Sequence, residues 1–209
     1  MVALIVVLVV VVLMALGLAV SYNRFVSQRQ QVQSAWANVD TELKRRYDLV
    51  PNLVATVQGY AAHERGVFDE VTRARAAAQA AQGPAASSAA EGPFAAALGR
   101  LIAVAENYPQ LKANENFLQL QSTLGDTENR IQQTRSYYNA VVQDFNRRIQ
   151  AFPSNLIAST FHFQPAEYFH IDEAERAVEA EPPRVDFSGM AQGSTQPSQP
   201  ALPPPQPGG

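Results

Sequence analysis

The pattern of apolar and polar residues begins with an unbroken apolar run over residues 1–20, and the first charged side chain is Arg24. A helix of about 20 residues rises roughly 30 Å, which matches the hydrocarbon core of a bilayer. The run, from Val2 to Val20, therefore predicts a transmembrane helix, so that residues 1–21 form a membrane anchor. Tyr22 stands where an aromatic residue meets the membrane interface.

A cleaved signal peptide is the alternative, because Ala19 and Ser21 offer small residues at a suitable spacing. The apolar run is longer than the roughly 7–15 residues of a signal sequence, and no Lys or Arg precedes it. Both features favour a retained anchor. Arg24 and Arg29 follow the run, so the positive-inside rule predicts the N-terminus outside and the bulk of the chain in the cytoplasm of a single-pass protein of the cell membrane.

Residues 22–152 carry apolar positions at a spacing of three and four, which predicts a helical bundle. No Pro or Gly interrupts the first stripe, so the anchor is expected to continue as one rod ending near Arg46. A second helix is predicted to open at Asp48, a good N-cap, with Pro51 in its first turn. Residues 82–93 are rich in Ala, Ser, Gly and Pro and predict a flexible surface connection.

A short helix is predicted over residues 94–107, followed by a long helix that runs to residue 152. Three long helices and one short one predict an all-α, antiparallel bundle. The predicted core residues lie on its two longest stripes: Trp36, Leu43, Phe117, Leu124, Ile131, Tyr138 and Phe145.

Beyond the bundle, residues 153–176 are rich in aromatic side chains and predict an extended arm packed along it. Residues 177–209 are rich in Pro and Gln and predict a disordered tail. Residues 167–186 carry a net charge of −5, against −3 for the whole chain, so the remainder is nearly neutral. This excludes the strongly basic surface of a nucleic-acid binder. The absence of cysteine excludes disulfides and thiol catalysis.

Several motifs between residues 22 and 169 resemble the LemA family of bacterial membrane proteins. They include Ala35-Trp36, the block LKRRYDLVPNLV at residues 43–54, Glu106-Asn107-Tyr108-Pro109 and Phe152-Pro153-Ser154-Asn155. The resemblance implies a single-pass anchor and a helical-bundle domain. It implies little about activity, because the family has no settled biochemical function. The sequence departs from the family at His162, where a Gly is usual.

Catalytic chemistry has one weak candidate. His63 and Glu64 begin like a zinc-binding HExxH helix, but Val67 occupies the position of the second histidine. Such a site needs about three protein ligands, and His162 and His170 are the only other histidines. We therefore expect no metal, no cofactor and no enzyme, with a hydrolase that uses His63 and Glu64 as the alternative.

Five residues form the candidate docking site for a protein partner: Lys44, Arg45, Arg46, Asp48 and Asn52. Arg45 lies 23 residues after Tyr22, about 35 Å along a helix. Because charge is screened over about 8 Å, this cluster is too far from the bilayer to bind lipid. It could instead complement its own helix dipole or receive the acidic arm.

Asn114, Asn116, Asn139 and Asn146 are interpreted as residues that fix the register between helices, because buried amides are hydrogen-bonded. The sequence thus predicts a membrane-anchored scaffold or adaptor that binds other proteins through its bundle. A laterally packed membrane assembly, with a homo-oligomer, is a further alternative.

Overall fold

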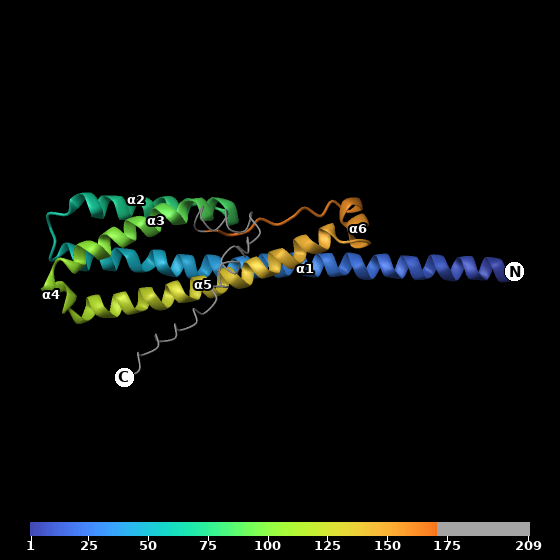
Figure 1. Ribbon diagram of the computed structural model, residues 1–209, viewed down its shortest axis with the longest axis horizontal. Helices are drawn as coiled ribbons and strands as arrows, with labels where there is room; N and C mark the ends of the chain where they lie inside the picture. The colour runs from blue at the N-terminus through green and yellow to red at the C-terminus, as the bar shows by residue number, and fades with distance from the viewer. Residues whose placement is uncertain (171–209) are drawn as a thin grey trace, which may run out of the picture. The chain divides into compact units, whose positions relative to one another are not determined.

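The computed structural model describes residues 1–170, and within them it contains six helices and no strand, which confirms the all-α class (Figure 1). The helices are α1 (Val2–Gln58), α2 (Arg65–Ala80), α3 (Gly83–Glu106), α4 (Pro109–Lys112), α5 (Glu115–Gln150) and α6 (Ser154–Thr160). The end of the predicted arm, residues 171–176, and the predicted tail, residues 177–209, lie outside the described part of the chain.

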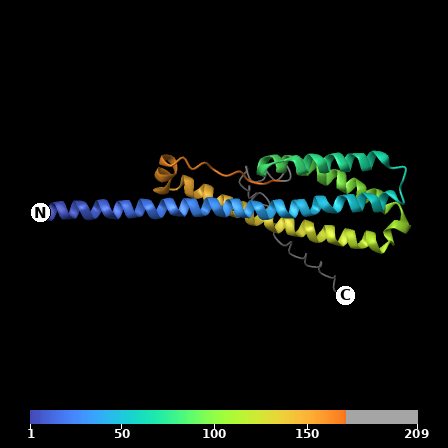
Figure 2. The same cartoon turned by 180° about the vertical axis from the view of Figure 1, so that it is seen from behind.

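Helix α1 is the axis of the described part. It contains 57 residues, so it is about 85 Å long. Its apolar N-terminal part is exposed and extends past all the other helices (Figures 1 and 2). Among residues 1–170 it is the one helix long and apolar enough to cross a membrane. The prediction that anchor and first bundle helix form one rod is confirmed.

The predicted break between Arg46 and Asp48 is wrong, because α1 continues through both residues and through Pro51. Proline cannot donate the hydrogen bond to the carbonyl four residues earlier, which belongs to Tyr47. Arg75 of α2 fills this role, since its Nε donates to the Tyr47 oxygen at 2.6 Å. A side chain 28 positions after Tyr47 thus satisfies the carbonyl oxygen that the proline leaves without a partner.

The predicted flexible connection over residues 82–93 is also wrong, because this segment is the first half of α3. Its alanines are strong helix formers, and Pro84 lies in the first turn, where its missing N–H is tolerated. Ser87, Ser88 and Glu91 are buried. The segment is therefore part of the bundle.

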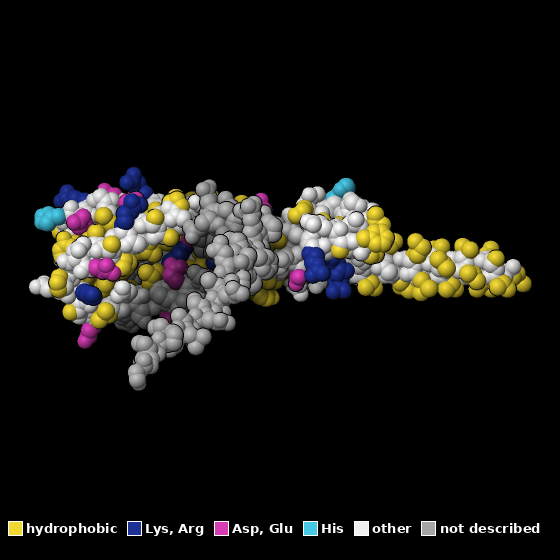
Figure 3. Space-filling view, viewed as in Figure 1, with side chains coloured by type: hydrophobic (Ala, Val, Ile, Leu, Met, Phe, Trp, Pro, Cys, Tyr) yellow, Lys and Arg dark blue, Asp and Glu magenta, His cyan; other side chains and the backbone are white. Residues whose placement is uncertain are grey.

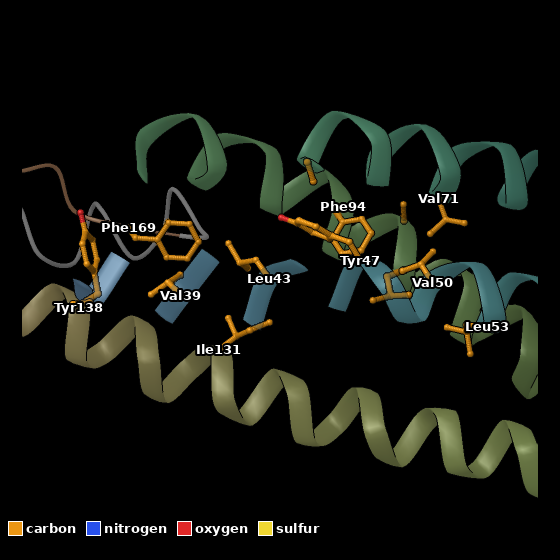
Figure 4. Packing of buried hydrophobic residues seen from close by; sticks show 14 of the residues in the cluster. Val39, Leu43, Tyr47, Val50, Leu53, Val71, Phe94, Ile131, Tyr138 and Phe169 are labelled. Atoms are coloured by element: carbon orange, nitrogen blue, oxygen red, sulfur yellow. The ribbon is translucent and has the colours of Figure 1, made fainter. Parts of the chain in front are cut away.

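Helix α5 runs antiparallel along α1, and α2 and α3 pack as a hairpin on another side of it (Figures 1 and 2). Five of the predicted core residues are buried: Leu43, Phe117, Ile131, Tyr138 and Phe145. Figure 4 shows Leu43 and Ile131 facing each other between α1 and α5. Trp36 and Leu124 are only half-buried, at the margin of the core. Ala35 and Val39 occupy the inward positions beside Trp36.

The arm differs from the expected extended segment, because it starts with α6. This helix ends in a Schellman motif: the N–H of Phe163 donates to the Ala158 oxygen at 2.9 Å, and that of His162 donates to Ser159 at 3.3 Å. The motif requires a left-handed residue, and His162 has a φ of 55°. Residues 163–170 then run back along the bundle, with Phe163 stacked on Phe25 at 4.8 Å between ring centroids (Figure 1).

Candidate functional site

The predicted docking residues lie on the part of α1 that is remote from the apolar segment. Lys44, Arg45, Asp48 and Asn52 are exposed. Lys44 pairs with Asp40 at 2.6 Å and Arg45 with Glu42 at 3.5 Å, both within α1. Exposed pairs of this kind are worth about 0–1 kcal/mol each, so both cations remain available to a partner. We call Lys44, Arg45, Asp48 and Asn52 the α1 polar face.

Arg46 does not belong to this face, and its assignment to the docking site is wrong. Its side chain is 2% exposed, because each helical residue turns by about 100° and Arg46 falls on the same stripe as Leu43 and Val50. It forms an ion pair with Glu91 of α3. Its Nη1 also donates to both carboxylate oxygens of Glu128 on α5, at 2.7 and 3.0 Å.

These residues form a cluster with Tyr47, whose hydroxyl donates to Glu91; Arg46, Tyr47 and Glu91 are buried, and Glu128 lies at the edge of the cluster. The Arg46 guanidinium lies 5.0 Å from the ring centre of Phe94, and the Tyr47 ring meets the same Phe94 ring edge-on (Figure 4). Burial raises the pKa of Tyr47, and Asp40 adds to this while Arg46 opposes it. We call Arg46, Tyr47, Glu91 and Glu128 the Arg46 cluster. It ties α1, α3 and α5 together.

Sequence reasoning missed Glu91 because it treated residues 82–93 as a connection. A signal for Arg46 was present, since it lies three residues after Leu43 and four before Val50. No comparable signal identified Glu91, whose partner is 45 positions away on another helix. Glu91 is completely buried, so its role in the described structure is to hold the helices together.

A small groove of about 260 Å³ lies beside the α1 polar face, between α1 and the junction of α2 and α3. Its lining is mainly polar and small: Asp40, Leu43, Lys44, Tyr47, Asp48, Ala78, Gln79, Ala81 and Ser87. Asp48 on its rim lies 4.0 Å from Arg75. The groove suits a polar side chain of a partner better than an apolar one.

The candidate hydrolase residues lie in the turn between α1 and α2, where His63 is exposed and Glu64 precedes the first residue of α2. His162 follows the end of α6, and His170 lies in the arm with its ring 5.7 Å from that of Tyr168. Within residues 1–170, no group of three His, Cys, Asp or Glu side chains is placed to hold a metal ion.

Comparison with known proteins finds MamQ and LemA proteins as relatives of this chain. The magnetosome protein MamQ 2 of Paramagnetospirillum magneticum is 30% identical over 178 residues, which cover 73% of this chain and 65% of the relative. MamQ of Magnetospirillum gryphiswaldense is 28% identical, over 73% of this chain and 66% of its own length. The protein LemA of Metamycoplasma hominis is 24% identical, over 74% and 71%. This chain thus spans about two thirds of the length of the MamQ relatives.

These relatives and the apolar part of α1 support a single-pass membrane protein. The sequence profile of the LemA family matches residues 35–187, which include the α1 polar face and the Arg46 cluster. Since the match covers well over half of the sequence, this chain belongs to the LemA family.

Proposed function

We propose that the protein is a non-enzymatic, membrane-anchored scaffold whose helical bundle binds other proteins. One observation carries this proposal: α1 is uninterrupted from the apolar segment to the α1 polar face. Lys44 lies 24 residues beyond Val20, so the face is held about 36 Å from the end of the apolar run. A continuous helix packed against α5 is stiff, so a docked partner stays at a fixed height above the membrane.

The chemistry of the α1 polar face favours a protein partner. It carries charges of both signs, with the cations Lys44 and Arg45 about one helical turn before the anion Asp48, so a partner of mixed charge is complementary. The small groove beside Lys44 and Asp48 adds a concave contact to this exposed surface. At such a distance from the bilayer, lipid charge is fully screened.

We further propose that the bundle lies in the cytoplasm, because Arg24 and Arg29 follow the apolar segment. The natural chain contains no cysteine, so a single cysteine introduced at exposed Gln133 reports orientation directly. A membrane-impermeant thiol reagent should label Gln133→Cys only after the cells are opened. Labelling in intact cells would reverse the orientation.

The docking proposal is tested with a photo-crosslinking amino acid at Asn52 in intact membranes. Lys44→Glu with Arg45→Glu should abolish the cross-linked protein partners, because both cations of the face change sign. Arg65→Glu with Arg130→Glu is the matched control, since both residues are exposed and lie on α2 and α5. Unchanged capture in the Lys44 and Arg45 variant would move the docking site elsewhere. Cross-linking mainly to a second copy of the chain would favour a laterally packed assembly.

A further inference from the structure

A groove of about 770 Å³ lies where α1 leaves its apolar segment and passes the turn between α5 and α6. Its lining has two parts of different chemistry. Met14, Gly17 and Leu18 of α1 form an apolar wall, and Arg24, Arg147 and Arg148 form a basic one. This groove is distinct from the α1 polar face, which lies further along α1.

The position of the groove along α1 matches the boundary of a bilayer. The apolar run ends at Val20, so Met14 and Leu18 lie at the depth of acyl chains. Arg24 lies four residues further, about 6 Å along the helix. The headgroup layer of one leaflet is about 5–8 Å thick. The groove therefore runs from the hydrocarbon into the headgroup layer.

The arginines of the basic wall have no ion-pair partner among the residues that the structure describes. Within residues 1–170, none of Arg24, Arg147 and Arg148 forms an ion pair, whereas Lys44, Arg45 and Arg46 all do. Asp144 is the acidic residue of the lining, so the groove has a net positive charge. The Nε of Arg148 and the Oε1 of Gln28 are buried and have no hydrogen-bond partner among the described residues. Burial lowers the pKa of Arg148, and the like charge of Arg24 lowers it further.

Large apolar side chains lie exposed beside the groove. Phe152, Leu156 and Phe161 are 81%, 59% and 52% exposed, and the Phe161 ring lies 4.8 Å from that of Tyr22. Figure 3 shows apolar side chains next to dark blue basic ones where the bundle meets the apolar rod. Exposed aromatic groups next to arginines are typical of a surface that sits in a membrane interface. We call Phe152, Leu156 and Phe161 the α6 corner.

We propose that this groove binds the headgroup of an anionic phospholipid of the bilayer, with the α6 corner inserted in the same leaflet. The lipid phosphate accepts hydrogen bonds from Arg24, Arg147 and Arg148, whose planar guanidiniums match a phosphate well. An acyl chain lies against Met14, Gly17 and Leu18. A Cβ atom at Gly17 would have no atom within 4 Å, so the groove is open there. The lipid would fix the height of α1 in the bilayer and its rotation about its own axis. A single apolar helix without such a contact can shift and rotate.

The test uses the full-length protein in a zwitterionic detergent, with bound lipids counted by native mass spectrometry. Phosphatidylglycerol should be retained at least about tenfold better than phosphatidylcholine. Arg24→Gln with Arg147→Gln should lose this preference, whereas Arg65→Gln with Arg130→Gln should keep it. Arg148 stays unchanged because its guanidinium packs 5.2 Å from the Phe25 ring centre. Equal retention of both lipids by the wild type, or an unchanged preference in the first variant, would overturn the proposal.

Two further arms separate the lipid from a free anion. Gly17→Leu leaves the charge intact and fills the apolar wall, so it should reduce phosphatidylglycerol retention without altering helicity by circular dichroism. A large excess of inorganic phosphate should not displace the lipid, because phosphate makes no apolar contacts. Displacement by phosphate would show that a free anion is the ligand, and full retention in Gly17→Leu would overturn the placement of the acyl chain against Gly17.

Discussion

Asn146 of α5 and Ala166 of the arm exchange two hydrogen bonds. The Asn146 Nδ2 donates to the Ala166 oxygen at 2.9 Å, and the Ala166 N–H donates to the Asn146 Oδ1 at 2.8 Å. Asn139 and Phe169 repeat this arrangement, with both distances at 3.0 Å. Between these two pairs, the Tyr138 hydroxyl donates to the backbone carbonyl oxygen of Glu167 at 2.6 Å.

The spacing explains why a helix can bind an extended chain in this way. Asn139 and Asn146 are seven residues apart, which is two helical turns and about 10.5 Å. Ala166 and Phe169 are three residues apart, which is about 10 Å in an extended chain. The two amide side chains therefore take the place of a neighbouring strand for the arm.

Asn146→Ala should release the arm from the bundle. The substitution leaves both the N–H and the oxygen of Ala166 without a partner, which costs about 1–3 kcal/mol for each buried group that water does not reach. Hydrogen exchange at residues 163–170 should speed up, while exchange in α2 and α3 should stay unchanged. Gln143→Ala, an exposed change on the same helix, is the control. Slow exchange of the arm in Asn146→Ala would mean that its aromatic contacts suffice.

Arg46→Met should be strongly destabilising, because it leaves Glu91 as an unpaired charge in the core. Loss of one partner of a buried ion pair costs about 3–5 kcal/mol. Adding Glu91→Leu should recover more than half of the loss, since the remaining partner, Glu128, reaches solvent. The free energy of unfolding in detergent, followed by circular dichroism, measures both.

Arg45→Met is the matched control for this cycle, because Arg45 is the exposed neighbour on the same helix. It should change the free energy of unfolding by no more than about 0.5 kcal/mol. Similar losses for Arg45→Met and Arg46→Met would contradict the burial of the Arg46 cluster. No recovery in the double variant would assign Glu91 a packing role rather than an electrostatic one.

Tyr138 should make stability depend on pH in alkaline solution. Burial, and secondarily the charge of Glu167, raises the pKa of Tyr138 to about 12 from 10.0. The unfolded chain then loses its tyrosine proton first, so stability is intact below pH 10 and falls as the pH rises towards 12. The loss should be about 2–3 kcal/mol at most. Tyr138→Phe should flatten this slope relative to exposed Tyr137→Phe. Equal slopes in the two variants would mean that the Tyr138 hydroxyl titrates normally.

The local pattern of apolar residues was enough to predict the long apolar segment of α1, the seam of α5 and the all-α class. The local pattern was not enough where a side chain distant in the sequence provides the hydrogen bond or the opposite charge that a residue needs. Pro51 lies within a helix because Arg75 satisfies the Tyr47 oxygen. Residues 83–93 are helical, and Glu91 among them is buried, where Arg46 neutralises its charge.

The predicted docking site shows the same limit. Lys44, Arg45, Asp48 and Asn52 are exposed, but Arg46, in the middle of the same sequence block, is not. The amide pattern of Asn139 and Asn146 was interpreted as fixing register between helices, whereas their partner is the backbone of the arm. In each case the missing information is the identity of a partner distant in the sequence.

His162 offers a last prediction, because it is the one residue other than glycine with a positive φ among residues 1–170. A left-handed backbone costs a residue with a Cβ about 1–2 kcal/mol, and glycine avoids this at an entropic cost of about 0.5–1 kcal/mol. His162→Gly should therefore stabilise the protein by about 0.5–1 kcal/mol in denaturant unfolding. Ser159→Gly, within α6, should instead destabilise it by a similar amount. A loss of stability in His162→Gly would mean that the imidazole makes a contact worth more than the backbone strain that glycine removes at this position.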